Sequence, residues 1–149
     1  MSITAMALDV GERRIGVAVA NIEVGLSRPL LTLQNDINLF ATINKLIRER
    51  QVAILVVGLP RNLSGDDTSQ TQYTRDFIEK LKQHVDVPVY SIDEAGTSAK
   101  AKDELAQKGK DYVKSDIDAL AATYILEDFL ASEASTITKV KQTYADKKT

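Results

Sequence analysis

Three acidic residues occupy positions from which their carboxylates can act together. Asp9 and Glu94 each end or follow a short apolar run typical of a buried strand, and Asp118 lies in the first turn of a predicted helix. Because ligands gather beyond the carboxyl ends of parallel strands, we expect Asp9 and Glu94 to point into one region, where a helix N-terminus can add Asp118. Three carboxylates in one place form a site of hard oxygen ligands for Mg²⁺ or Mn²⁺.

Such a group of acids is costly unless a cation neutralises it. Two carboxylates about 4 Å apart repel each other by about 1 kcal/mol in water and by about 4 kcal/mol at an effective dielectric constant of 20. A pair of divalent ions removes this repulsion, activates water and stabilises the leaving oxygen of a phosphodiester. The pattern does not require the three acids to meet, because a strand-end acid is often a turn or cap residue, and Asp118 can simply complement the helix dipole.

The segment that begins at Asp9 adds a possible phosphate contact. It continues through a tight turn at Gly11 to the adjacent Arg13 and Arg14. An acid beside two arginines can hold a metal ion and a phosphate side by side. A similar spacing opens the phosphate-binding hairpin of actin- and hexokinase-like ATPases, but those enzymes need two such lobes, and 149 residues cannot supply them.

Four further positions are candidates with ordinary alternatives. Gly58 and Pro60 follow an apolar strand, where a glycine either lets a backbone approach the substrate or simply ends the strand. We include both as substrate-binding candidates. Asp116 is either a helix N-cap or a fourth acid at the site. His84 ends a predicted helix, where a surface or structural role is expected.

The composition excludes several classes of chemistry. The absence of cysteine excludes disulfides, thiol catalysis and zinc–thiolate sites, and a single histidine argues against Ser-His-Asp chemistry. With 19 basic and 21 acidic residues the net charge is −2, so nucleic-acid binding needs a local basic patch. The best basic stretch consists of the lysines at 100, 102, 108, 110 and 114. No apolar run approaches the ~18 residues of a membrane span, and no signal peptide is evident, so we expect a cytoplasmic protein that does not bind membranes.

Hydrophobic periodicity predicts an α/β domain of three layers with a mixed five-stranded sheet. Two strands joined by a tight link form an antiparallel hairpin, and Pro29 marks the following strand as an edge strand. The remaining elements alternate between helices and strands and end in two helices. The expected elements are strands at 3–9, 14–20, about 30–33, 52–57 and 87–92, and helices at about 38–50, 68–84, 98–107 and 116–130. Residues 132–149 have no sustained apolar stripe, which predicts a polar, lysine-containing tail that is solvated or frayed.

Four segments together resemble the YqgF/RuvX family of Holliday-junction-resolvase-like proteins or pre-16S rRNA nucleases. The order and spacing of the segments also match that family, and the likeness extends over residues 3–131. The segments are LDVGERRIGVAV (8–19), VVGLPRNLSG (56–65), DEAGTS (93–98) and IDALAA (117–122).

The resemblance implies an RNase H-like nuclease domain over residues 1–131 that uses Mg²⁺ or Mn²⁺ and acts in maturing the 5′ end of 16S ribosomal RNA. Asp9, Glu94 and Asp118 fall on the family's three acidic positions, which makes them the implied catalytic residues and metal ligands. Arg13 falls where the family usually has a basic residue. The sequence departs from the family pattern at Ala95, where arginine is typical.

The leading hypothesis is therefore a metal-dependent nuclease of structured RNA, with Arg13 or Arg14 holding a phosphate during attack by metal-bound water. One alternative is a non-catalytic RNase H-like module that only binds nucleic acid. Another is a resolvase that cuts branched DNA as a dimer. The sequence leaves open one metal ion or two, RNA or DNA, and the oligomeric state.

Overall fold

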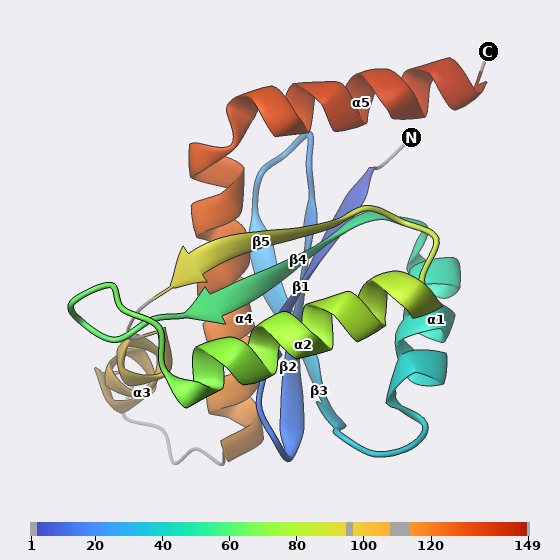
Figure 1. The fold of residues 1–149 in the computed structure, drawn as a ribbon. Coiled ribbons are helices and arrows are strands. Elements are labelled where there is room, and N and C mark those ends of the chain that lie inside the picture. Colours follow the sequence, from blue (N-terminus) through green and yellow to red (C-terminus); the bar gives the residue numbers. More distant parts are fainter. Residues whose placement is uncertain (1–2, 95–96, 108–113, 149) are drawn as a thin grey trace.

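The computed structural model describes residues 3–94, 97–107 and 114–148, which form five strands and five helices (Figure 1). The position of Ala95 and part of the lysine-rich stretch lie outside these residues. The elements are β1 (Thr4–Val10), β2 (Arg14–Asn21), β3 (Ser27–Gln34), α1 (Leu39–Arg50), β4 (Val52–Pro60), α2 (Ser69–His84), β5 (Val89–Glu94), α3 (Thr97–Gln107), α4 (Lys114–Ser132) and α5 (Ala134–Lys148).

The strands form one mixed sheet in the order β3-β2-β1-β4-β5. The first three strands are antiparallel neighbours, whereas β1–β4 and β4–β5 are parallel pairs. This arrangement confirms the predicted mixed five-stranded sheet. Pro29 lies on β3, at the edge of the sheet, where the missing N–H of a proline leaves no gap in an inner ladder.

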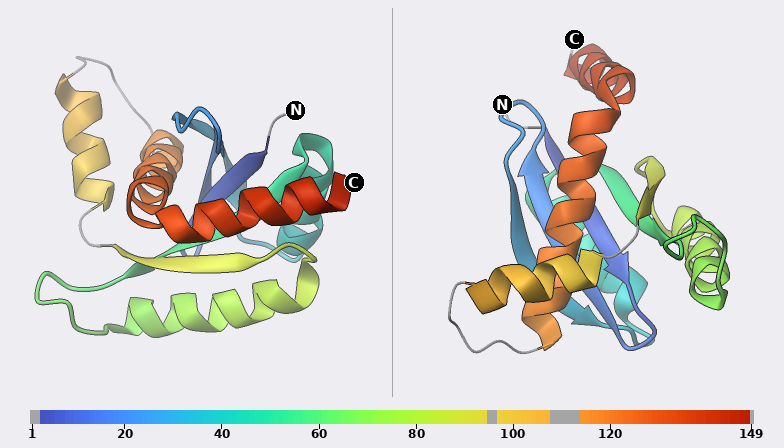
Figure 2. Two further views of the ribbon diagram at one scale, coloured as in Figure 1. Left: turned by 90° about the horizontal axis from the view of Figure 1, so that it is seen from above. Right: turned by 90° about the vertical axis from the view of Figure 1, so that its left-hand side faces the viewer.

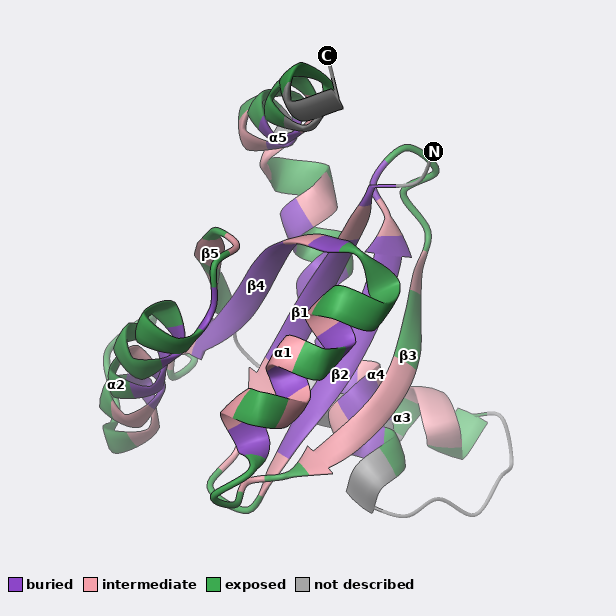
Figure 3. Ribbon diagram, turned by 90° about the vertical axis from the view of Figure 1, so that its right-hand side faces the viewer, coloured by how far each residue is buried: buried purple, intermediate pink, exposed green. Residues whose placement is uncertain are grey.

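Helices cover both faces of the sheet, with α1 and α2 on one side and α4 on the other (Figures 1 and 2). Strand β1 supplies alternate residues to the two faces. Met6 and Leu8 belong to the core beneath α1 and α2, and Ala5 and Ala7 belong to the core beneath α4. The central strands are buried along most of their length, whereas the edge strand β3 is only half covered (Figure 3).

The side chains under α4 are unusually small. Ala5, Ala7, Ala18 and Ala20 of β1 and β2 are all buried there, and the space is filled by large residues from the helix. Those large residues include Ile125, Leu126 and Phe129. Helix α4 therefore lies close to the backbone of the sheet, which matters for the position of its first turns.

Helix α3 lies beside the first half of α4 (Figure 2). Ala101 of α3 is buried together with Ile117 and Tyr124 of α4 in a small separate core. The Tyr124 hydroxyl donates a hydrogen bond to Glu104, which ties the two helices together.

The C-terminal residues differ from the expected frayed tail, because most of them form α5. Ile137 and Val140, three residues apart, lie on one face of this helix and are buried against the α4-side core. Lys141 also lies 3.6 Å from Glu23. Two apolar residues are too few to register as a stripe in the sequence, yet they suffice to dock a helix on an existing core. The division of the chain into a nuclease domain and a tail stays a prediction.

One element boundary is set by tertiary pairing and another by a local cap. Strand β4 runs to Pro60, three residues beyond the predicted end, because Gly58, Leu59 and Pro60 pair with β5. Helix α2 begins after Thr68, whose side chain and Thr71 form a capping box. Over the described residues, no helix is long and apolar enough to cross a membrane.

Candidate active site

Asp9 lies near the carboxyl end of β1, directly opposite Gly16 of β2. It alternates with Ala5 and Ala7, so its side chain lies on the face of the sheet that α4 covers. The residue is only half-buried, whereas Val10 beside it belongs to the core on the other face. Asp9 therefore stands at the rim of the α4-side core, where a carboxyl is shielded from water on most sides.

Gly16 brings α4 to Asp9. A Cβ atom at this position would overlap the backbone carbonyl of Asp118 and crowd the nitrogen of Ala119. Only a residue without a side chain allows α4 to approach β2 this closely. Since Gly16 pairs with Asp9, the same contact places Asp118 next to Asp9.

Asp118 also bonds to Arg14, on the same strand as Gly16. The Arg14 Nε donates to Asp118 Oδ2 at 2.7 Å, and the two side chains are 29% and 20% exposed. The sequence predicts that Arg13 or Arg14 holds a substrate phosphate. The structure shows the Arg14 guanidinium paired with a predicted metal ligand, and a phosphate contact of Arg14 stays a prediction.

The Asp9 carboxyl holds its proton unusually tightly. Burial, and secondarily the nearby Asp118 carboxylate, raise the pKa of Asp9 from 3.8 to about 7. A cation between the two acids would replace that proton and compensate the negative charge of both carboxylates, because metal binding requires the deprotonated ligand.

Glu94 ends β5 and lies opposite Pro60 of β4. It alternates with Tyr90 and Ile92, which pack against the α4-side core, so it faces the same side of the sheet as Asp9. Its Oε1 atom is buried. Because β1 stops pairing with β4 at Leu8, while β5 continues to Glu94, the glutamate lies farther along the sheet.

Within residues 3–94, 97–107 and 114–148, no three acidic, histidine or cysteine side chains stand close enough to hold a metal ion. The structure thus brings together Asp9 and Asp118, and Glu94 is not grouped with them. Two carboxylates still fit the cation that was predicted, since Mg²⁺ is often bound by one or two carboxylates completed by water and substrate phosphates. The donor set is all oxygen, as that ion prefers.

The other predicted site residues differ in how exposed they are and in what they contact. Arg13 is exposed at the β1–β2 turn. Gly58 is buried, and a Cβ there would lie 2.5 Å from Ile125 Cδ1, so helix packing accounts for this glycine. The Pro60 carbonyl accepts a hydrogen bond from Thr71. Contacts of Arg13, Gly58 and Pro60 with substrate stay predictions.

The two remaining candidates are His84 and Asp116. His84 ends α2, stacks on Phe40 with ring centroids 4.4 Å apart and bonds through Nδ1 to the Lys80 carbonyl, in keeping with the expected structural role. Asp116 lies in the first turn of α4, which begins at Lys114, and not at the N-cap.

Two features of the site escaped the sequence analysis. Gly16 was read only as part of a strand, although a glycine among buried aliphatic residues is a signal of close backbone approach. The second is an ionic cluster next to Glu94, in which Arg61 and Arg75 share Asp67. Its members lie 6 and 8 residues apart, two in a loop and one in a helix, so no helix or strand periodicity links them.

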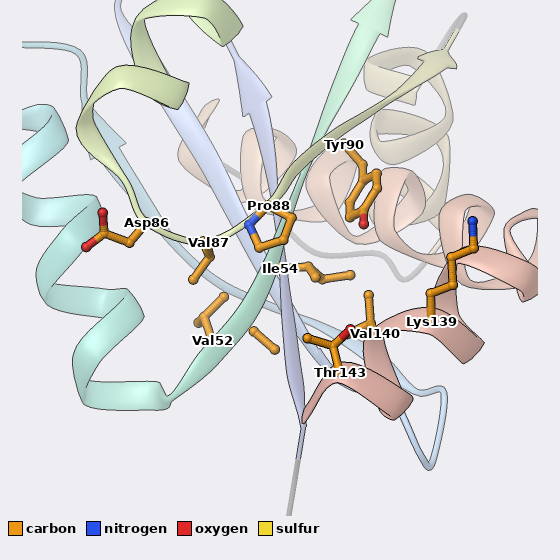
Figure 4. A pocket seen from close by; sticks show the side chains of 10 residues that line it. Val52, Ile54, Asp86, Val87, Pro88, Tyr90, Lys139, Val140 and Thr143 are labelled. Carbon is orange, nitrogen blue, oxygen red and sulfur yellow. The ribbon is translucent and has the colours of Figure 1, made fainter. Parts of the chain in front are cut away.

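A cavity of about 250 Å³ lies elsewhere in the molecule (Figure 4). It is lined by the first residues of β4, by residues just before and at the start of β5, and by α5, with Val52, Pro88 and Val140 on its walls. Asp9 and Glu94 stand at the other ends of their strands, so this cavity is separate from the candidate active site.

Structures of known proteins share this fold. The chain aligns with a Thermus thermophilus RuvC in complex with a Holliday junction substrate at a TM-score of 0.56 and 15% identity, covering 90% of this chain and 97% of the other. It aligns with a fowlpox virus resolvase bound to Holliday junction DNA at a TM-score of 0.51 and 9% identity, covering 87% and 98%. These likenesses confirm the RNase H-like fold predicted from the sequence.

Relatives of similar length are closer in sequence. A protein of Neisseria gonorrhoeae is 42% identical over 132 residues, covering 85% of this chain and 87% of its own. One from Sulfurihydrogenibium is 39% identical over 127 residues, covering 84% and 88%. Both carry the name "Putative pre-16S rRNA nuclease". A model of the RuvX family, described as Holliday junction resolvase, matches residues 3–132. The chain therefore belongs to the RuvX family.

Proposed function

We propose that this protein is a divalent-metal-dependent nuclease that hydrolyses phosphodiester bonds near the 5′ end of pre-16S ribosomal RNA in the cytoplasm. The observation that supports this most is the meeting of Asp9 and Asp118 at the carboxyl edge of the sheet. Two carboxylates brought together away from water repel each other and raise the free energy of the folded protein, unless a bound cation neutralises their charge. The names of the relatives supply the substrate class.

The proposed roles follow from the surroundings of each residue. Asp9 and Asp118 would hold Mg²⁺ or Mn²⁺, and Glu94, which lies farther along the same face of the sheet, would be the third acid at the ion. Such an ion lowers the pKa of bound water and neutralises charge on the scissile phosphate. Asp9 gives up its proton when the cation binds, and Arg14 keeps Asp118 in place through Oδ2. Arg13 is exposed in the turn that follows Asp9, and it contacts a phosphate of the substrate.

Cleavage of a synthetic RNA with the 5′ leader of 16S rRNA tests the proposal. We expect cleavage with Mg²⁺ or Mn²⁺, and a loss of more than about a hundredfold in Asp9→Asn, Asp118→Asn and Glu94→Gln, since even outer partners of a metal site cost that much. Asp116→Asn is the matched control, because it makes the same charge change on an exposed residue of the same helix. Equal activity of Asp118→Asn and Asp116→Asn would refute the proposed metal site.

Branched DNA is a second candidate substrate, favoured by the description of the matching family as Holliday junction resolvase. A four-way DNA junction belongs in the same assay, with solution mass measured alongside, because resolution of a junction needs two active sites. Faster cleavage of the junction than of the RNA would select this alternative. Binding of either nucleic acid without any cleavage would select a non-catalytic module.

A further inference from the structure

Three charged residues form a preassembled cluster where β4 passes into α2. Arg61 follows the last residue of β4, Asp67 precedes the α2 N-cap, and Arg75 lies in the second turn of α2. Arg61 Nη1 donates to Asp67 Oδ1, and Arg75 Nη1 donates to Asp67 Oδ2. Arg75 Nη2 is a further 3.3 Å from Oδ1. Both oxygens of one carboxylate are thus held by two guanidinium groups.

Arg61 has more donors than this carboxylate uses. Its Nη2 lies 3.4 Å from Asp93 Oδ1, and its Nε is buried without a hydrogen-bond partner among the described residues. Its backbone N–H donates to the Glu94 carbonyl at 3.0 Å. The contacts with Asp93 and Glu94 attach the cluster directly to the end of β5 that carries the proposed third metal ligand.

The loop around the cluster has a defined conformation. The Asn62 side chain accepts hydrogen bonds from the backbone N–H groups of Ser64 and Asp66. Gly65 adopts φ +80°, a left-handed conformation that glycine tolerates best. The backbone after Arg61 is therefore held by hydrogen bonds that do not involve the Asp67 side chain, and Arg75 is carried by α2.

The geometry points to a phosphodiester-binding subsite formed by Arg61 and Arg75, in which the Asp67 carboxylate stands in for the two non-bridging oxygens of a substrate phosphate. Guanidinium groups bind carboxylates and phosphates with the same paired geometry, so one can replace the other. The side chains of Asp67 and Arg75 are 50% and 38% exposed, which leaves the exchange open to an incoming strand. The inference rests on the proposed function, since it requires a nucleic-acid substrate.

The charges in the cluster explain why the Asp67 side chain must turn away from the two arginines before a phosphate can bind them. With Asp67 and Asp93 both present, the two arginines are balanced and the local net charge is zero. When the Asp67 side chain turns away, two positive groups face one negative group, and the local charge becomes +1. A protein with a net charge of −2 thereby gains a basic contact only when a phosphate arrives.

Binding measurements without cleavage test this subsite separately from catalysis. Fluorescence anisotropy of a labelled RNA carrying the 16S 5′ leader, and of a four-way DNA junction, is measured in EDTA over a range of salt concentrations. We expect Asp67→Asn to bind roughly threefold to tenfold more tightly than the wild type, because two exposed ion pairs no longer compete. Asp66→Asn is the matched control: it makes the same charge change one residue away and should have a much smaller effect.

Substitution of Arg75 tests the arginine side. Arg75→Gln should weaken binding and reduce the slope of log K against log salt by roughly 0.7 to 0.9, the value for one phosphate contact. Arg75→Lys keeps the charge and the fold but loses the paired geometry, so it should also weaken binding. Thermal melts of each variant show whether folding is intact.

Equal affinities of Asp67→Asn and Asp66→Asn, or an unchanged salt slope in both Arg75 variants, would overturn the subsite while leaving cleavage by the wild type unaffected. The reverse pattern separates the two proposals. Tighter binding by Asp67→Asn alone, with no cleavage of either substrate by the wild type, would support the subsite and reject the nuclease. Failure of the wild type to bind either nucleic acid would reject both.

Discussion

Arg14 and Asp118 are 104 residues apart in the chain, and their side chains meet at 2.7 Å between Nε and Oδ2. This ion pair attaches α4 to β2 beside the backbone contact at Gly16. It also supplies a positive charge next to two acids, Asp9 and Asp118, that otherwise repel each other.

The raised pKa of Asp9 predicts an unusual dependence of stability on pH. The folded pKa is about 7 and the unfolded value 3.8, so between these values the folded state binds a proton that the unfolded state does not. The free energy of unfolding should therefore fall as the pH rises from about 4 to about 7, by up to about 4 kcal/mol, and then level off. Asp9→Asn should remove this contribution and be the more stable protein at pH 8 without metal.

Urea denaturation in EDTA at pH 5 and pH 8 measures the effect as the difference between the two proteins. Asp116→Asn serves as control, because Asp116 is exposed and its substitution should leave the pH dependence unchanged. If Asp9→Asn retained the full pH dependence of the wild type, the Asp9 carboxyl would not be the group that titrates.

Metal affinity should depend on the same proton. A cation displaces the Asp9 proton, so the affinity for Mg²⁺ should rise about tenfold per pH unit below pH 7 and become constant above it. Isothermal titration with Mn²⁺ at pH 6, 7 and 8 measures this directly. Asp118→Asn should bind more weakly at every pH, whereas an affinity independent of pH would place the cation away from Asp9.

Arg14 and Arg13 should differ sharply although they are neighbours. Arg14→Gln leaves Asp118 without its counter-charge, and we expect a loss of about 1 kcal/mol in unfolding free energy without metal. Mg²⁺ should then stabilise the variant more than the wild type, since it replaces the missing positive charge. Arg13→Gln, on an exposed residue, should leave stability unchanged and weaken only RNA binding. Thermal melts with and without Mg²⁺ distinguish the two, and identical behaviour would contradict these roles.

Gly16 and Gly58 both face α4, but an added methyl group should have different costs. At Gly16 it meets the backbone of Asp118, which no rotamer change can move, so Gly16→Ala should lose about 3 kcal/mol and most metal binding. At Gly58 it meets the Ile125 side chain, so Gly58→Ala should cost about 1 to 2 kcal/mol.

A rescue experiment checks this distinction. Ile125→Val removes the Cδ1 atom nearest to position 58 and should recover part of the stability of Gly58→Ala. The same change should do nothing for Gly16→Ala. Chemical denaturation of the single and double variants gives the comparison, and a rescue of both glycine variants would show that α4 moves as a unit.

The elements of the fold were predictable because each depends on local pattern. The apolar run of β1, the antiparallel hairpin that it forms with β2 and the edge position implied by Pro29 all appear in the structure where they were expected. Helix α5 was missed because its stability comes from two residues, Ile137 and Val140, which dock on a core built by distant strands. The hydrophobic pattern of one segment holds no information about its contacts with distant strands.

The candidate site was predictable only in part for the same reason. Position at a strand end selected Asp9, and position in a helix selected Asp118, but their meeting depends on how closely α4 approaches β2. That approach is fixed by the missing side chain at Gly16. The ion pair between Arg14 and Asp118 was not predictable, because a sequence shows which residues are charged and not which partners they find 104 residues away.

The alanines under α4 have a practical consequence for protein engineering. Enlarging small buried residues is a common way to raise thermal stability, and on the side covered by α1 and α2 it would act on packing alone. A methyl group added to Ala7 or Ala18 would instead lift α4 and carry its aspartate away from β1. Libraries designed to stabilise this protein should leave the α4 side untouched, because added methyl groups there would cost packing energy as well as the position of Asp118.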